Sequence, residues 1–376
     1  MALPADELTP RSASGDVDID AQRECILHDH AMTTQKLGEE TPPDFRGYAA
    51  AGAAALQRWY SPWTGRWRTT GWWNAANALT SVVDYTERTG DRTFAWVINW
   101  TFRVARWRHR HFINSFFDDN GWWALAWLRA YELTGEKRYL AAGQRIFQNM
   151  TTGWDDTCGG GLWWNHDRTY KNAIPNELFL AAAARLHRLS PRGSHYLDWA
   201  RREWDWFSAS GMIGQNGLVN DGLTADCMNN GKPTYTYNQG VILGGLGDLY
   251  EITGESDYVR HGERIADAVL SELTTPGAAV LAGILIEPGE ADMAGRRGDG
   301  SQFKGVCARY LCDFSRHTGR PVYRDFIIRN ARSVWENSRN ANDQFGVCWA
   351  GPFDTADASR QSSALDVLNA AVLLTS

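Results

Sequence analysis

Hydrophobic positions recur at helical spacing along the chain, and two kinds of helix alternate from about residue 46 onward. Segments such as 122–133 and 238–250 are apolar on nearly every face, which is typical of helices buried on most sides. Segments such as 139–150 and 196–207 carry an apolar stripe opposite charged residues, as expected of helices with one face in solvent. We predict about twelve helices, which begin near residues 46, 72, 93, 120, 137, 174, 194, 237, 256, 302, 321 and 359.

Short corners of similar sequence join each buried helix to the amphipathic helix that follows it. Each ends a helix near a Thr-Gly pair, where glycine is expected to adopt the left-handed conformation that closes helices. The clearest copies contain Gly90, Gly135 and Gly254, a looser copy contains Gly319, and a degenerate copy spans 186–191. Corners repeated in this way predict helical hairpins in series.

The alternation of buried and amphipathic helices predicts an all-α fold, an (α/α)6 barrel in which six outer helices enclose six inner ones. An open solenoid would expose both ends and usually needs polar capping repeats. The last segment, 364–374, is strongly apolar, so we expect the ring to close. We assign residues 46–376 to this single catalytic domain and residues 1–45 to a polar N-terminal extension, partly disordered or packed on the barrel.

The long connections of the predicted ring fall on one side, because each runs from an outer helix to the next inner helix. Long loops often carry function. We therefore expect a cleft on the side where the inner helices begin. These connections span 112–120, 152–173, 208–236, 274–301 and 339–358.

Two adjacent aspartates, Asp118 and Asp119, stand at one inner-helix start, just before an aromatic run. Helix capping is the ordinary role of such residues. Two neighbouring carboxyls also suit glycoside cleavage, in which one attacks the anomeric carbon and the other donates a proton. Their adjacency suits a retaining mechanism better than an inverting one. The residues alone do not say which aspartate takes which role.

Aromatic rings and amides recur at the other inner-helix starts. Rings can cover the apolar faces of sugars, and amides can bind sugar hydroxyls, although each residue taken singly could be a helix cap. We predict that substrate is bound by Trp73, Asn74, Trp122, Trp123, Trp164, Asn172, Asn176, Tyr237, Asn238, Gln239 and Lys304.

The composition favours a carbohydrate-handling protein over a nucleic-acid binder, with 19 tryptophans and a net charge of -6. A basic cluster at 103–111 alternates with Trp107 and Phe112, which favours a solvated helix face over a phosphate site. No apolar run reaches the length of a membrane span, and the N-terminus lacks an export signal. We expect a monomer without membrane span or nucleic-acid partner, cytoplasmic by default, or secreted if an export signal was removed.

Several smaller features admit two interpretations. The six cysteines lack metal-binding spacing, so we expect no metal or cofactor, and we favour buried thiols over a bond between Cys158 and Cys227. The glycine run 159–161 predicts either a turn or a close approach of backbone to ligand. The pair Asp155 and Asp156 is interpreted as loop, with calcium as the alternative. The glycine-rich stretch 283–300, which includes Asp299, is predicted to be a mobile surface loop.

Four sequence blocks carry a specific resemblance. They are FDDNGWWALAW at 117–127, GGGLWW at 159–164, KNAIPNE at 171–177 and YTYNQG at 235–240. In content and order they resemble glycoside hydrolase family 76, the endo-α-1,6-mannanases, over roughly residues 46–375. The resemblance implies an (α/α)6 barrel, a retaining mechanism, Asp118 as nucleophile and Asp119 as general acid/base. The family's bacterial members are usually exported, which this N-terminus does not match.

We therefore expect a retaining glycoside hydrolase that cleaves α-mannosidic linkages, specifically an endo-α-1,6-mannanase acting on α-mannan or manno-oligosaccharides. One alternative is a mannan transglycosylase that uses the same aspartates. Another is a non-catalytic carbohydrate-binding toroid. A sugar epimerase would need histidines at the inner-helix starts, and those starts lack them.

Overall fold

The predicted helices are present in the structure, a computed structural model that describes residues 42–190, 194–277 and 281–376. Most of the predicted extension 1–45 lies outside these residues. The inner helices are α3 (Trp72–Thr89), α5 (Phe117–Thr134), α7 (Ala173–Leu189), α9 (Thr236–Thr253), α12 (Phe303–Thr318) and α14 (Ala358–Thr375). The outer helices are α2 (Phe45–Gln57), α4 (Trp96–Arg108), α6 (Lys137–Met150), α8 (Ser194–Ala209), α10 (Ser256–Glu272) and α13 (Pro321–Asn337). The short elements are a hairpin of β1 (Tyr60–Ser61) and β2 (Arg66–Trp67), and α11 (Glu290–Met293).

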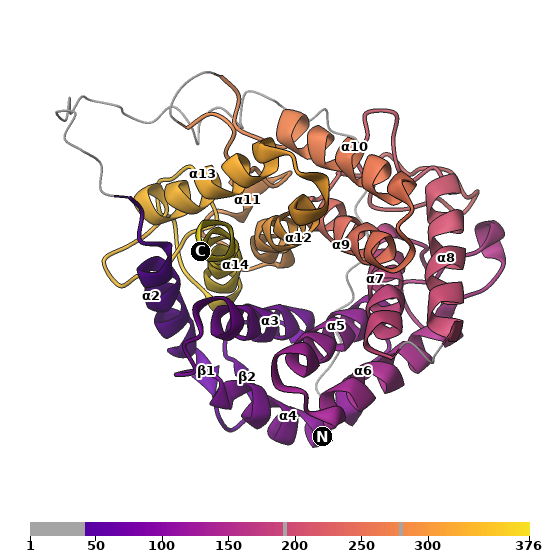
Figure 1. Cartoon of the computed structure of the whole chain (residues 1–376), viewed down its shortest axis with the longest axis horizontal. Coiled ribbons are helices and arrows are strands. Elements are labelled where there is room, and N and C mark those ends of the chain that lie inside the picture. Colours follow the sequence, from indigo (N-terminus) through magenta and orange to yellow (C-terminus); the bar gives the residue numbers. More distant parts are fainter. Residues whose placement is uncertain (1–41, 191–193, 278–280) are drawn as a thin grey trace. The chain divides into compact units, whose positions relative to one another are not determined.

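The six inner helices form a closed ring (Figure 1). Each packs against the next along the chain, and α14 returns to pack against α3. The outer helices surround this ring, with α8 against α7 and α10 against α9, for example. The apolar C-terminal segment is thereby buried as the last inner helix, from Ala358 to Val372. The (α/α)6 barrel predicted from the sequence is confirmed.

The short corners have the predicted geometry. Gly90, Gly135, Gly254 and Gly319 follow α3, α5, α9 and α12 with φ between 64° and 75°, the left-handed region that favours glycine. The degenerate corner ends α7 at Ser190 without glycine, where the backbone N–H of Ser190 donates to the carbonyl of Leu186. These corners put the ends of the inner helices on one side of the ring and their starts on the other.

A repeated amide fastens the long loops to the inner helices. The fourth residue of α5, α7, α9 and α14 is a buried asparagine or glutamine. In each case the side-chain amide accepts a hydrogen bond from a backbone N–H of the preceding long loop and donates to a carbonyl of the same loop. The pairs are Asn120 with Asn114, Asn176 with Leu162, Gln239 with Val219, and Gln361 with Phe345 and Asp343. Because buried backbone groups need partners, these amides hold the loops against the helix starts.

The glycine-rich stretch 283–300 is not the simple surface loop that its composition predicted. Ile284 and Leu285 are buried, and the backbone N–H of Leu285 donates to Asn330 on α13. The buried carboxylate of Glu287 accepts the backbone N–H of Thr236 at the start of α9. Composition misled because the glycines supply turns, while the few apolar residues between them anchor the segment.

Cys158 and Cys227 form a disulfide with their Cα atoms 5.3 Å apart, so the prediction of free thiols is wrong for this pair. The bond joins the long loop before α7 to the long loop before α9. Pattern alone did not favour it, because 69 residues separate the two cysteines. Cys307 and Cys312 are buried thiols, as predicted. Cys25 lies outside the described residues.

Candidate active site

A cavity of about 380 Å³ opens where the inner helices begin. Its lining repeats one structural position, since the second residue of four inner helices faces it: Trp73 of α3, Asp118 of α5, Ile174 of α7 and Tyr237 of α9. The other lining residues are Trp122 and Phe303 from the helices and, from the loops, Trp164, Tyr170, Asn172, Asp221, Lys232, Tyr235 and Asp299. The volume lies within the range of small-molecule binding sites.

Asp118 stands in this cavity with one defined hydrogen bond. The indole N–H of Trp164 donates to Asp118 Oδ2 over 3.0 Å. The backbone N–H of Phe117 in turn donates to the carbonyl of Trp164, so the loop is attached to the start of α5 at two points. Asp118 Oδ1 is buried and has no hydrogen-bond partner among the described residues. A carboxylate oxygen without a partner is costly, and this is typical of a group retained for chemistry.

Asp119 is held by the loop that precedes α5. The side-chain amide of Asn114 donates to Asp119 Oδ2, and the loop is itself fastened by Asn120. Asp299 lines the same cavity as Asp118 and accepts a hydrogen bond from the indole N–H of Trp73 over 2.8 Å. It belongs to the stretch 283–300, which the sequence pattern predicted to be a surface loop. Neither Asn114 nor Asp299 was among the predicted site residues.

Both catalytic candidates bind protons more tightly than ordinary aspartates. Burial raises the pKa of Asp118 to about 7, and repulsion from Asp119 contributes to the rise. Burial raises the pKa of Asp119 to about 6 against the opposing hydrogen bond from Asn114, and the charge of Asp299 adds to the increase. Between about pH 6 and pH 7 the two carboxyls therefore share about one proton, which is held mainly by Asp118. One ionised and one protonated carboxyl is the state that retaining glycoside cleavage requires.

Aromatic rings form the wall of the cavity. The rings of Tyr237 and Phe303 stack with centroids 3.9 Å apart, and the ring of Trp73 lies 5.5 Å from that of Trp122. The ring centroids of Trp122 and Tyr237 are 6.5 Å apart, so the aromatic wall connects α5 with α9. Such flat apolar faces suit the apolar faces of sugar rings.

Polar groups from two long loops complete the rim. The hydroxyl of Tyr170 donates to Asp221 Oδ2 over 2.7 Å, and the side-chain amide of Asn230 donates to the same hydroxyl. The ammonium group of Lys232 lies 4.8 Å from the centre of the Tyr170 ring. We did not predict these residues, because they lie in loops whose sequence carries no helix-start pattern.

Five predicted substrate-binding residues line the cavity, namely Trp73, Trp122, Trp164, Asn172 and Tyr237. Two others, Asn176 and Gln239, are the buried amides that hold the long loops. They do not line the cavity because a helix turns by about 100° per residue, so positions two residues beyond the lining one point elsewhere.

The remaining predicted residues also lie outside the cavity lining. Trp123 is fully buried between Phe112 and Trp127, on the side of α5 away from the cavity. Asn74 and Asn238 are buried third residues of their helices. Lys304 is buried in an ion pair with Glu290, and its ammonium lies 4.9 Å from the Trp349 ring.

The glycine run at 159–161 forms a tight turn around a buried lysine. The Lys171 ammonium donates to the carbonyls of Gly160 and Gly161 and lies 3.0 Å from Asp155 Oδ1. A Cβ on Gly161 would lie 2.2 Å from the ring of Trp206. Gly160 and Gly161 are thus required by packing against Trp206, which supports the turn interpretation. The charge of Asp155 is already neutralised by Lys171, which supports the interpretation of this pair as part of a loop rather than as a calcium site.

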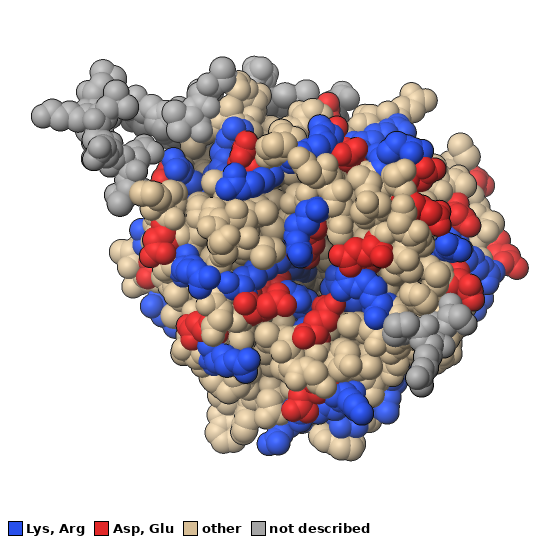
Figure 2. Space-filling model, in the orientation of Figure 1, with Lys and Arg blue, Asp and Glu red and all other residues tan. Residues whose placement is uncertain are grey.

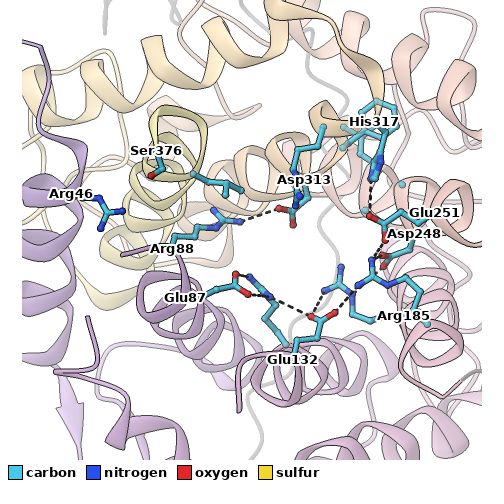
Figure 3. A pocket seen from close by; sticks show the side chains of 18 residues that line it. Arg46, Glu87, Arg88, Glu132, Arg185, Asp248, Glu251, Asp313, His317 and Ser376 are labelled. Carbon is cyan, nitrogen blue, oxygen red and sulfur yellow. Dashed lines mark hydrogen bonds and ion pairs between the residues drawn. The ribbon is translucent and has the colours of Figure 1, made fainter. Parts of the chain in front are cut away.

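A second cavity, of about 360 Å³, lies where the inner helices end (Figure 3). Figure 2 shows this face, where basic and acidic side chains alternate around a hollow. Each carboxylate that lines the cavity is paired with an arginine. The pairs are Glu87 with Arg129, Glu132 and Asp248 with Arg185 and Arg188, Glu251 with Arg188, and Asp313 with Arg88. Carboxylates neutralised in this way are poor proton donors, so we assign this cavity a structural role.

No cluster of three or more histidine, cysteine, aspartate or glutamate side chains in the described part of the chain has the geometry of a metal site. None of the helices described here is both long and apolar enough to cross a bilayer.

The sequence is similar to those of several curated proteins. Among curated relatives, the mannan endo-1,6-alpha-mannosidase DCW1 of Candida albicans is 30% identical over 219 residues, which are 52% of this chain and 48% of that protein. The Saccharomyces cerevisiae protein of the same name is 35% identical over 153 residues, 36% of this chain and 34% of that protein. The chain thus spans about half the length, or less, of these relatives.

Solved structures resemble nearly the whole barrel. One is an inactive α-1,6-mannanase of Salegentibacter, with two consecutive aspartates replaced by alanine, in complex with α-1,6-mannotetrose. It is 25% identical with a TM-score of 0.78, covering 88% of this chain and 100% of that one. The Lin0763 protein of Listeria innocua is 27% identical with a TM-score of 0.78, covering 89% of this chain and 98% of that one. Residues 51–376 match the model of glycosyl hydrolase family 76, and the chain belongs to this family.

Proposed function

We propose that the protein is a retaining endo-α-1,6-mannanase that uses Asp118 and Asp119 as its catalytic pair. The observation that carries this proposal is the raised pKa of both carboxyls beside a cavity walled by aromatic rings. The relatives named as mannan endo-1,6-alpha-mannosidases support the linkage and the endo action. The Salegentibacter variant, inactive after loss of two consecutive aspartates, supports the pair.

In the first step, the Asp118 carboxylate attacks the anomeric carbon while the Asp119 carboxyl donates its proton to the glycosidic oxygen. The C–O bond to the leaving chain breaks, and a glycosyl-enzyme ester forms on Asp118. In the second step, the Asp119 carboxylate takes a proton from water, whose oxygen attacks the anomeric carbon and releases Asp118. Two inversions give net retention of the α configuration.

The resemblance to glycoside hydrolase family 76 assigns these roles, whereas the pKa of Asp118, about 7, lies above that of Asp119, about 6. The indole N–H of Trp164 stabilises the ionised form of Asp118, which the nucleophile requires. The contacts of Asp119 oppose one another, because the charge of Asp299 favours its protonated form and the hydrogen bond from Asn114 favours its ionised form. Trp164 also joins its loop to α5 through the backbone of Phe117. The disulfide at Cys158 and the hydrogen bond from Lys171 to Gly161 hold the same loop, and so they help to position Trp164 beside Asp118.

Incubation with linear α-1,6-mannan tests the function. We expect fragments of several lengths early in the reaction, as endo cleavage requires, and NMR should show the α anomer as the first product. Failure to shorten the polymer, or a β anomer as the first product, would contradict the proposal. An added acceptor sugar that is incorporated into longer chains would instead identify a transglycosylase with the same aspartates.

We also propose that the protein works as a monomer in an oxidising compartment. Disulfides such as Cys158–Cys227 persist mainly in oxidising environments. Light scattering of the purified protein tests the first point. Thiol labelling of protein taken directly from its host tests the second, because labelled Cys158 or Cys227 would contradict it.

A further inference from the structure

A third cavity, of about 560 Å³, adjoins the candidate active site and is basic. It lies at the end of α4 and is lined by three arginines, two histidines and no acidic residue. The lining residues are Arg66, Trp72, Arg108, His109, Arg110, Ile113, Asn114, Ser115 and His166. The sequence pattern favoured a solvated helix face for this cluster, and Arg103 and Trp107 are indeed exposed, while Arg108, His109 and Arg110 line the cavity.

The positive charge of this cavity is not neutralised within the described part of the chain. Arg66, Arg108 and Arg110 form no ion pair with a carboxylate there, and Arg66 Nε is buried without a hydrogen-bond partner. Residues 92–117 include five arginines and no aspartate or glutamate, although the whole chain carries a net charge of -6. Burial lowers the pKa of His109, and the charges of Arg66 and Arg108 lower it further. A cavity with this excess of positive charge is complementary to an anion.

The backbone that shapes this cavity is strained. Arg110, His111 and Phe112 follow one another with φ of 44°, 61° and 71°. Non-glycine residues rarely adopt this region, and such strain persists only where surrounding packing imposes it. Here the anchor is Phe112, which is fully buried against Trp123 and Trp127. The strained turn places Arg108, His109 and Arg110 together at the end of α4.

Three chain segments line both this basic cavity and the catalytic one. In the first segment, Trp72 lines the basic cavity and Trp73 lines the catalytic one. In the second segment, His166 lines the basic cavity and Trp164 lines the catalytic one. In the third segment Asn114 lines the basic cavity and donates a hydrogen bond to Asp119. The basic cavity is therefore on the side of the proposed proton donor, where the leaving part of the substrate must lie.

We propose that this cavity is a subsite for a phosphate group. The phosphate is carried by the leaving part of the glycan, whose glycosidic oxygen takes the proton of Asp119. The proposal rests on the proposed function and adds a substrate class to it, namely phosphorylated α-mannans. Guanidinium groups bind phosphate through paired hydrogen bonds, and three arginines line this cavity without a carboxylate in its lining. The imidazoles of His109 and His166 offer further donors at the rim.

The first test compares cleavage of α-1,6-mannotetraose with cleavage of the same tetraose carrying a phosphomonoester on its reducing-end sugar. For the natural protein, we expect kcat/KM to be at least about tenfold higher for the phosphorylated substrate at low salt. Arg108→Gln should reduce this ratio several-fold. Arg103→Gln is the matched control, because Arg103 is an exposed arginine of the same helix outside the cavity. Equal kcat/KM for the two substrates, or equal effects of the two variants, would overturn the proposal.

The second test measures binding without turnover. Titration calorimetry of the Asp118→Asn protein would compare mannose, mannose 6-phosphate and inorganic phosphate. We expect mannose 6-phosphate to bind most tightly and its Kd to rise about tenfold when Arg108→Gln is added. Binding of inorganic phosphate alone, or no dependence on Arg108, would overturn the proposal. If neither tetraose were cleaved but this binding persisted, the mannanase function would fail while the anion subsite stood.

Discussion

The two ends of the inner ring use the same kinds of residue for opposite purposes. Where the inner helices end, arginines neutralise the carboxylates, and the pKa of Asp84 is lowered because Arg88 and Arg129 outweigh the effect of burial (Figure 3). Where the inner helices begin, Asp118 and Asp119 have no arginine partner, and burial raises their pKa. Helix α5 carries both arrangements, with the aspartates at its start and Arg129 near its end.

This contrast distinguishes a structural cluster from a reactive one. Paired charges at the short-corner end connect five inner helices. Unpaired carboxyls at the long-loop end are costly to bury, and the fold tolerates them because the loops hold them beside the cavity. The number of charged residues in a cavity is therefore a weaker guide to catalysis than the number without a partner.

The largest expected effect is loss of catalysis in Asp118→Asn. Asparagine is close in size but cannot form the glycosyl-enzyme, so kcat/KM on α-1,6-mannan should fall by at least about a thousandfold. The unfolding temperature should not fall, since no ion pair is lost. Steady-state assays and thermal unfolding of the same preparation measure both. Retained turnover in this variant would remove Asp118 from the mechanism.

The matched change at the other end is Asp248→Asn. Asp248 is buried and contacts Arg185 and Arg188, so its loss should cost about 3 kcal/mol of unfolding free energy by leaving buried positive charge. Urea unfolding measures this cost. Activity per folded molecule should stay close to that of the natural protein. A variant that is stable but inactive would mean that the short-corner end takes part in catalysis.

A smaller effect is expected when the hydrogen bond to Asp118 is removed. Trp164→Phe keeps an aromatic ring but deletes the N–H donor, which should lower kcat/KM about tenfold. Trp163→Phe is the control, because the Trp163 indole donates to Asp155 outside the cavity. Equal losses in the two variants would mean that the effect arises from loop packing rather than from the contact with Asp118.

The smallest effect concerns stability against pH, and it should have opposite signs at the two ends. The pKa of Asp118 is raised from 3.8 to about 7, so the folded protein loses stability as pH rises through this interval. Asp118→Asn should therefore stabilise the protein at pH 8 and leave its stability nearly unchanged at pH 4.

The control for this experiment is Asp84→Asn at the opposite end. The pKa of Asp84 is lowered, so its contribution to stability is present above its ordinary pKa and is lost as pH falls through the folded value. Asp84→Asn should therefore destabilise the protein at pH 8. Urea titrations at both pH values measure the two shifts, and equal signs at pH 8 would contradict the comparison.

The architecture was predictable because hydrophobic periodicity and the repeated corners are local signals. The catalytic pair was predictable because it directly precedes a buried helix. It was harder to predict which side of each inner helix faces the cavity. Trp122 faces the cavity and Trp123 faces away from it, although the two are adjacent and chemically identical. A signal for the phase existed in the amide that recurs at the fourth helix position, as in Asn176 and Gln239, which marks a buried side.

The long loops contributed what the sequence could not reveal. Asp221 and Asp299 reach the cavity from segments without periodic pattern, and their positions depend on contacts made far along the chain. The disulfide between Cys158 and Cys227 was equally hard to predict, because it forms only where two loops that are distant in the sequence come together in space. Such placements follow from tertiary packing, which residue spacing does not encode.

Covalent trapping tests the central claim most directly, namely that Asp118 is the nucleophile of an unpaired catalytic couple. A fluorinated mannosyl substrate that slows release of the glycosyl-enzyme would be incubated with the protein, and peptides would be examined by mass spectrometry. We expect one mannosyl adduct per protein, located on Asp118. An adduct on Asp119 or on another carboxylate, or continued turnover of this substrate without an adduct, would contradict the claim.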